Sequence, residues 1–179
     1  AVKGNVEITA NFEINKYTVS ISSSEESKGN VNSKSVIVNH GSTLTVNGNT
    51  LTVGGTTVSA TGTEGYEFDY WNIGGSKRSS GYSTTVTGAV TAKAYFKVQK
   101  CTVKVNAGAN GSVSQGSFDV DYGTTVKTDG ASIKVGSTKK STASASTGYS
   151  FKNWSSDWSS GYAVKGNVEI TANFEINKY

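Results

Sequence analysis

The chain has 179 residues, and its composition favours small β modules over a helical domain. Hydrophobic residues make up 35% of it, there is no Pro and no Met, and globular domains usually reach about 45–50% when Gly is counted too. The net charge of +4 is scattered, with only Lys77-Arg78 and Lys139-Lys140 adjacent, which argues against a nucleic-acid-binding stripe. No run approaches the roughly 18 apolar residues of a membrane span, and a single cysteine, Cys101, excludes an internal disulfide framework.

Two levels of repetition organise the chain. Residues 1–17 and 163–179 are the same string, displaced by 162 residues. Within that period a weaker repeat relates unit A, residues 16–99, to unit B, residues 100–179, with an offset that falls from 84 to 78 residues as hairpin loops change length. We therefore expect residues 1–15 to be the terminal strand of a preceding B-type unit.

Short strands are expected along the whole chain. Residues 168–176, like their copy near the start, alternate apolar and polar side chains, which is the pattern of a strand with one buried face. In unit A we expect strands near 17–22, 35–39, 43–46, 50–53, 56–60, 66–71, 83–86 and 90–98. Asn47-Gly48 and Asp129-Gly130 are favoured central pairs of type I′ hairpin turns, so each unit is predicted to be an antiparallel meander.

The large aromatic side chains are expected to form the centre of each unit. A unit of about 80 residues buries only a little over 60% of its extended-chain surface, so a few large side chains must dominate its core. Period-2 alternation places Trp71 off the face of Tyr66 and Phe68 unless a bulge or turn intervenes. The expected centres are Tyr66, Phe68, Trp71 and Phe96 in unit A, and Tyr149, Phe151, Trp154 and Phe174 in unit B.

The motif Gly-Tyr-x-Phe-x-x-Trp with a later Ala-x-Phe resembles the Listeria–Bacteroides repeat, or internalin B-repeat, in a divergent form. The residues that match the motif are Gly65, Tyr66, Phe68, Trp71, Ala94 and Phe96, and again Gly148, Tyr149, Phe151, Trp154, Ala172 and Phe174. The resemblance implies a compact β-grasp-like module, strung in tandem in large secreted or wall-attached microbial proteins, adhesins among them. An added hairpin at 44–58 and 126–141 favours an all-β variant of that fold.

No catalytic or metal site is expected. The single histidine, His40, corresponds to Tyr122 in unit B, so the two units do not repeat a nucleophile, base and orienting group that could converge. Asp119 and Asp121 share a strand face, but calcium needs about 6 to 8 oxygens from several segments. We therefore expect no catalytic residue, no metal and no cofactor.

Three loop aromatics, which we expect to be exposed, are the candidate ligand-binding residues. Trp158, Tyr82 and Tyr162 lie in Ser/Gly-rich loops, where a ring could stack on a sugar or contact a partner protein. Alternatively, Tyr82 and Tyr162, which recur in a Ser-Ser-Gly-Tyr sequence, anchor a loop or fill a junction between units, since scattered surface aromatics are common.

These features favour a non-enzymatic tandem-repeat module of a secreted or cell-surface microbial protein, acting as a stalk, an adhesin or a fibre-forming spacer. Its expected partners are neighbouring repeats, a second copy, and a host or microbial surface protein or glycan, without nucleic acid or membrane insertion. The duplicated segment is expected to add as a strand to an exposed edge of unit A or of a neighbouring chain. The alternative is a carbohydrate-binding module that uses Trp158, Tyr82 and Tyr162.

Overall fold

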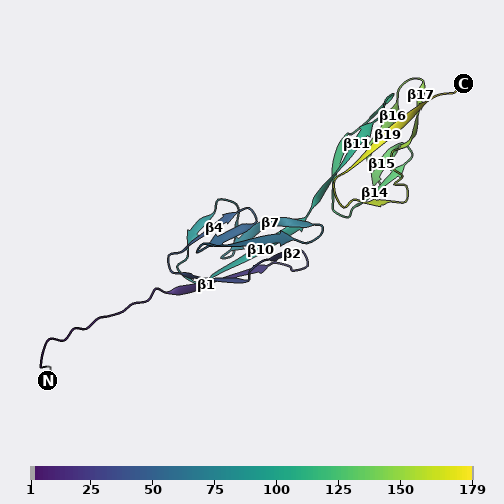
Figure 1. The fold of residues 1–179 in the computed structure, drawn as a ribbon. Coiled ribbons are helices and arrows are strands. Elements are labelled where there is room, and N and C mark those ends of the chain that lie inside the picture. Colours follow the sequence, from purple (N-terminus) through teal and green to yellow (C-terminus); the bar gives the residue numbers. More distant parts are fainter. Residues whose placement is uncertain (1–2, 179) are drawn as a thin grey trace. The chain divides into compact units, whose positions relative to one another are not determined.

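A computed structural model describes residues 3–178, which divide into two compact units (Figure 1). The first unit holds the residues up to Thr63 and Phe68–Phe96, and the second holds Glu64–Glu67 and the residues from Lys97 onward. The described residues contain strands and turns without a helix, which confirms the all-β class, while the β-grasp-like detail is not confirmed. Ala1, Val2 and Tyr179, the ends of the duplicated segment, lie outside the described residues.

The first unit contains two five-stranded sheets, ordered β3-β1-β10-β7-β8 and β2-β6-β5-β4-β9. Its strands are β1 (Lys16–Ser23), β2 (Gly29–Val31), β3 (Ser35–Asn39), β4 (Thr43–Asn47), β5 (Thr50–Val53), β6 (Thr56–Gly62), β7 (Tyr66–Ile73), β8 (Ser76–Arg78), β9 (Ser83–Thr85) and β10 (Val90–Val98). Inward-facing residues of both sheets form one core, with Val19, Leu44 and Trp71 fully buried.

The second unit repeats this plan with sheets ordered β13-β11-β19-β17 and β12-β16-β15-β14-β18. Its strands are β11 (Lys100–Ala107), β12 (Gly111–Val113), β13 (Ser117–Asp121), β14 (Thr125–Asp129), β15 (Ser132–Val135), β16 (Thr138–Ala145), β17 (Tyr149–Trp154), β18 (Tyr162–Ala163) and β19 (Val168–Ile176). Its core includes Val103, Ile133 and Ile170, all fully buried. Cys101 is also buried, on β11.

The first and last strands of each unit pair side by side in parallel. β1 pairs with β10 from Val19↔Val90 to Ser23↔Ala94, and β11 pairs with β19 from Val103↔Val168 onward. The prediction of a simple antiparallel meander is therefore wrong for these strands, although β4, β5 and β6 do form one. A parallel pair needs a long crossover, and here the rest of the unit provides it.

Two short strands of the first unit were not predicted. β2 and β8 are three residues long, too short to show alternation. β8 follows a turn at Gly74-Gly75 in which both residues have positive φ, as a type I′ turn requires. The described second unit has no counterpart of β8 after β17, which explains part of the drift in the repeat offset.

The hairpin between β4 and β5 turns one residue later than predicted. Asn47 pairs with Thr50, so the central pair is Gly48-Asn49, and only Gly48 has a positive φ, at 54°. A positive φ at the first central position alone fits a type II′ turn rather than the predicted type I′. Gly130 makes the same turn between β14 and β15.

Aromatic rings are packed in the same way in both units. The ring centroids of Phe68 and Trp71 lie 5.7 Å apart, and Phe68 meets Phe96 edge to face at 6.3 Å. In the second unit the register of β17 against β19 shifts between Phe151 and Asn153. Such a bulge changes the parity of the strand, and Trp154 joins Phe151 in the core.

Tyr66 and Tyr149 were expected at the centres, but the structure places them elsewhere. Both are half-buried and belong to neither core cluster. They open β7 and β17 directly after Gly65 and Gly148, which have positive φ.

Each closing strand presses a phenylalanine ring onto a glycine of the second sheet. A Cβ at Gly29 would lie 2.4 Å from Phe96 Cε1, and one at Gly111 would lie 2.2 Å from the ring of Phe174. Real Cβ atoms do not approach carbon so closely, so only glycine allows this contact. In each unit the two sheets thus contact each other where a phenylalanine ring packs against the backbone of a glycine.

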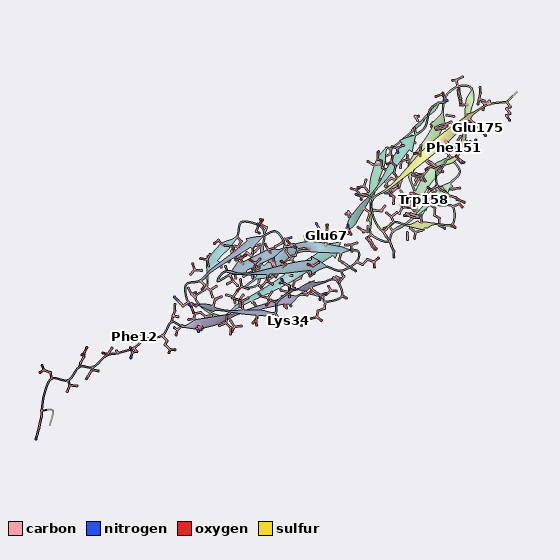
Figure 2. All side chains as sticks on the ribbon, in the orientation of Figure 1. Phe12, Lys34, Glu67, Phe151, Trp158 and Glu175 are labelled. Atoms are coloured by element: carbon pink, nitrogen blue, oxygen red, sulfur yellow. The ribbon has the colours of Figure 1, made fainter. Side chains whose placement is uncertain are left out.

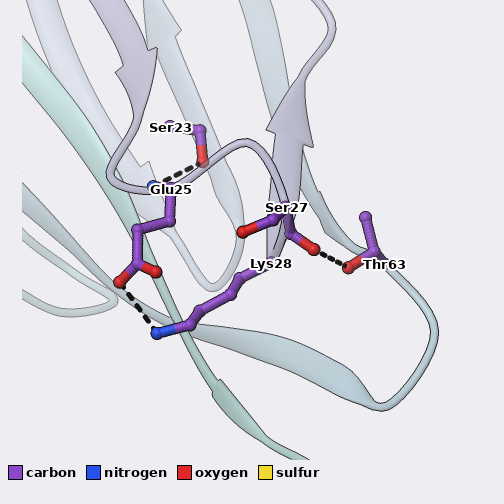
Figure 3. A network of polar contacts seen from close by, with 5 residues as sticks. All are labelled: Ser23, Glu25, Ser27, Lys28 and Thr63. Carbon is purple, nitrogen blue, oxygen red and sulfur yellow. Dashed lines mark hydrogen bonds and ion pairs between the residues drawn. The ribbon is translucent and has the colours of Figure 1, made fainter.

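Exposed polar contacts hold the loop that leads into Gly29 (Figure 3). Lys28 Nζ donates to Glu25 Oε1 at 2.8 Å, and the Glu25 N–H donates to Ser23 Oγ at 3.2 Å. Thr63 Oγ1 donates to the Ser27 carbonyl at 2.8 Å. Exposed ion pairs contribute little to stability, so we assign the network to loop conformation rather than to the core.

Replacing Gly29 with alanine should destabilise the first unit by about 1–3 kcal/mol, because added volume in a closed core forces its neighbours to shift. Chemical denaturation followed by the NMR signal of the Trp71 indole N–H, which separates it from the other two tryptophans, measures the change. Gly88→Ala is the matched control, since its new Cβ meets no atom within 4 Å. Equal losses in both variants would contradict the ring-on-glycine contact, and a smaller loss for Gly29→Ala in a Phe96→Leu background would support it.

Candidate functional site

Trp158 is a buried ring, and the expectation that it is exposed is wrong. It is 7% exposed and stacks on Tyr162 with ring centroids 4.7 Å apart and planes 11° apart. Its backbone N–H also donates to Thr128 Oγ1 at 3.2 Å. Figure 2 labels Trp158 and Phe151 within the second unit. The indole therefore offers little surface to a sugar.

Arg78 takes the place of Trp158 in the first unit. Both residues directly precede a Ser-Ser-Gly-Tyr sequence, and the Arg78 guanidinium lies 4.3 Å from the centre of the Tyr82 ring. A cation over a tyrosine face is attractive, as is a stacked indole. The position before Ser-Ser-Gly-Tyr thus covers the tyrosine in both units, with different chemistry.

The Ser-Ser-Gly-Tyr loops are fastened to the edge of the second sheet. The Gly81 N–H donates to the Val46 carbonyl, and the Val46 N–H donates to the Tyr82 carbonyl, both at 2.9 Å. In the second unit Tyr162 pairs with Val126. These bonds support the loop-anchoring interpretation of Tyr82 and Tyr162, whose binding of a ligand stays a prediction.

A stacked tyrosine pair on the first sheet was missed from the sequence. Tyr70 on β7 and Tyr95 on β10 lie 4.7 Å apart with planes 5° apart, and Lys77 Nζ lies 4.1 Å from the Tyr70 ring centre. Both rings are half-buried. The signal available was their position, since Tyr70 precedes the buried Trp71 and must face the other side of the strand.

The equivalent pair in the second unit is made of two amides. Asn173 Nδ2 donates to Asn153 Oδ1 at 2.9 Å, across the same two strands. Cross-strand pairs stabilise sheets whether they are aromatic or hydrogen-bonded. Because the chemistry differs between the units while the position is kept, we assign the Tyr70–Tyr95 pair to sheet stability.

A polar cluster in the second unit joins Glu64, Tyr122 and Lys165. Tyr122 Oη donates to Glu64 Oε1, and Lys165 Nζ lies 3.6 Å from the same oxygen. The hydrogen bond with Glu64 raises the pKa of Tyr122 to about 12. The hydrogen bond from Tyr122 and then the charge of Lys165 lower the pKa of Glu64. The phenol is held neutral and is not activated as a nucleophile.

The pKa values of the other shifted groups also lie further from neutral pH than their ordinary values. Hydrogen bonds from Lys134, Ser159 and Asn106 are the main causes that lower the pKa values of Asp129, Asp157 and Glu169. A hydrogen bond to Asp121 raises the pKa of Lys100. A general acid or base works best with a pKa near the working pH, and these shifts act in the opposite direction.

The described part of the chain shows two further absences. Among residues 3–178 no group of three or more His, Cys, Asp and Glu side chains is placed to hold a metal ion. Within the same residues we find no helical segment with the length and apolar character needed to cross a bilayer.

Comparison with known families gave two matches to one family. The model described as the divergent InlB B-repeat domain matches residues 17–100 and again residues 101–178. These ranges confirm the resemblance noted in the sequence. Neither the curated proteins nor the solved structures that were compared gave a match to the chain.

Removing either ring of the Trp158–Tyr162 stack should destabilise the second unit, and the two losses should not add. Trp158→Ala should cost about 3–5 kcal/mol, and a double-mutant cycle with Tyr162→Ala should give a coupling of about 0.5–1.5 kcal/mol. Denaturation followed by circular dichroism gives the free energy of unfolding of the unaltered chain, the two single variants and the double variant. Additive losses would contradict the stack, and Trp158→Ala paired with Tyr95→Ala, which lies in the other unit, serves as the additive control.

Glu64→Gln should lower the pKa of Tyr122 from about 12 toward its ordinary value of 10.0, because the carboxylate that disfavours the phenolate is lost. A pKa raised on folding stabilises the folded state below pH 10, and that contribution is lost as pH rises toward 12. An NMR titration of the Tyr122 ring measures the shift. Glu67→Gln in the same segment should leave the value unchanged, and an unchanged value in Glu64→Gln would contradict the assignment.

Proposed function

The chain belongs to the divergent InlB B-repeat domain family. From this premise we propose that it is a force-resisting, non-enzymatic spacer in a secreted or cell-surface microbial protein. As a B-repeat pair it is a tandem-repeat module. The family is typical of extracellular or cell-surface bacterial proteins and is typically non-catalytic. The proposal covers a stalk, an adhesin shaft or a fibre as the setting.

The observation that carries the proposal is the parallel pairing of the first and last strand in each unit. Because β1 and β10 run side by side in the same direction, the chain enters a unit at one end of the pair and leaves at the other. β11 and β19 repeat this arrangement. Each unit therefore separates the points where the chain enters and leaves it by the length of this parallel strand pair.

The same pairing places a pulling force along the strands. Tension between the ends of a unit loads the backbone hydrogen bonds of the parallel pair together, in shear, rather than one after another. The Phe96 ring, held against Gly29 and Phe68, resists sliding of β10. Such a unit yields only when several bonds and its core contacts break in one step, and unfolding under force is governed by that barrier.

Glycan binding is less well supported as a role. Trp158 is buried under Tyr162, and Tyr82 is covered by Arg78. Tyr162, at 37%, is the most exposed of the three candidates. Binding on a glycan array that is lost in Tyr162→Ala would revive this function.

Single-molecule stretching of the chain from its two ends tests the spacer proposal. We expect two separate unfolding events, each releasing roughly 3.3–3.6 Å of length per residue of one unit. For the first unit, handles at Lys16→Cys and Gln99→Cys load the pair in shear. A Cys101→Ala background removes the native thiol.

The matched control moves one handle from Gln99 to Gly88, which precedes β10. Since Gly88 and Lys16 lie at the same end of the parallel pair, the pair is then peeled open bond by bond. We expect a several-fold lower unfolding force in this geometry. Equal forces in the two geometries would overturn the force-resisting role.

A further inference from the structure

The outer edge of β3 in the first unit is an open strand edge, and we infer that it pairs with the same edge of a second copy of the chain. β3 lies at the end of its sheet and, among the described strands, pairs with β1 alone. The inferred pair is antiparallel and two-fold symmetric, with Ile37 at the axis. It goes beyond the spacer function and does not depend on it.

Alternate residues of β3 direct their backbone groups away from the sheet. The Ile21 N–H donates to the Lys34 carbonyl at 2.8 Å, which continues the register of β1 against β3. Antiparallel ladders use alternate residues for the bonds to one neighbour, so the even-numbered residues of β3 face β1. The N–H and C=O groups of Ser35, Ile37 and Asn39 therefore point outward.

These outward groups complement those of an identical strand. With the axis at Ile37, this residue lies opposite Ile37 of the second copy, and Ser35 lies opposite Asn39 of the second copy. Each pair can exchange both backbone hydrogen bonds. The Ser35 carbonyl already accepts from Ser33 Oγ at 3.2 Å, and the Asn39 carbonyl accepts from the Ser42 N–H at 3.1 Å. A carbonyl oxygen has a second lone pair for a further bond.

The side chains of this edge favour pairing. Ile37 is 68% exposed, while Val36 and Val38 pack against the core. In the pair the two Ile37 side chains lie opposite each other, which removes apolar surface from water. The strand itself carries no charge, and Lys34, directly before it, lies 3.5 Å from Glu26.

The second unit carries acids at the matching positions of its edge strand. β13 has Asp119 where β3 has Ile37, and Asp121 where β3 has Asn39. A two-fold pair of β13 strands would place Asp119 opposite itself, and like charges directly opposite destabilise a strand pair. Charged side chains on an edge are a common protection against edge pairing. The edge of the first unit lacks this protection.

Two-fold pairing joins chains that run in opposite directions. β3 is antiparallel to β1, which runs in the direction that the chain takes through the unit. The pair thus fits arrays that project from two facing surfaces; this setting, unlike the pairing, rests on the proposed surface location. One short strand should bury less than the roughly 1,200 Å² of a standard interface. A single pair is therefore weak, and arrays with several such edges gain strength through multivalency.

Sedimentation equilibrium and amide NMR of the full-length chain test the pair. We expect a monomer–dimer equilibrium with a Kd on the order of 0.1–1 mM, and concentration-dependent amide shifts centred on Ser35, Ile37 and Asn39. Ile37→Asp gives β3 the residue of the charged edge and should abolish both signals. Thr91→Asp is the matched control, because it adds the same charge at an exposed position of β10, inside the same sheet. It should dimerise like the unaltered chain.

Disulfide trapping tests the two-fold axis directly. In a Cys101→Ala background, Ile37→Cys places two thiols opposite each other, where Cα atoms are about 5.5 Å apart and a disulfide can form. With oxidised glutathione as the oxidant, we expect several-fold faster cross-linking than for Ser35→Cys. The two thiols of Ser35→Cys lie on opposite sides of the axis and are too far apart. A mixture of Ser35→Cys and Asn39→Cys should cross-link as heterodimers.

Each of four results would overturn the inference. The unaltered chain could stay monomeric over the whole concentration range, Ile37→Asp could dimerise as strongly as the unaltered chain, or Ile37→Cys could cross-link no faster than Ser35→Cys. Concentration-dependent shifts at Ile37 without cross-linking of Ile37→Cys would place another segment on this edge, such as the duplicated segment. None of these results bears on the stretching experiment, so the spacer function stands or falls separately.

Discussion

The parallel pairing of the opening and closing strands is the constraint on which each unit depends. β10 and β19 lie inside their sheets, between the opening strand and the strand that carries the tryptophan. The closing strand also brings Phe96 or Phe174 onto a glycine of the other sheet. One strand thus completes a sheet, seals the core and determines where the chain leaves the unit.

Much of the local structure could be predicted from the sequence. Period-2 alternation identified most strands, and the internal repeat indicated two sibling all-β units. The strands that escaped prediction, β2 and β8, are too short for alternation to show. The turn at Gly48 was placed one residue early because Asn-Gly is a strong hairpin signal, whereas cross-strand pairing determined which residue turned.

Non-local features could not be obtained in this way. Nothing near β1 or β10 in the sequence reports that they are neighbours, because a parallel pair has no connecting turn. Trp158 looked exposed from its Ser-rich surroundings, yet a ring four positions away, Tyr162, covers it. Comparison of Arg78 with Trp158 could have indicated this role, since a guanidinium and an indole share a preference for a tyrosine face.

The placement of the duplicated segment has a consequence for inheritance. The segment begins at Ala163, the last residue of β18, and contains all of β19, and its copies are 162 residues apart. Unequal crossing-over between the encoding stretches would delete or insert one unit of each kind together. Because β11 and β17 precede the segment in the chain, every recombinant would still end a complete sheet with its proper last strand. Variation in the number of repeat units would thus leave each unit with all of its strands.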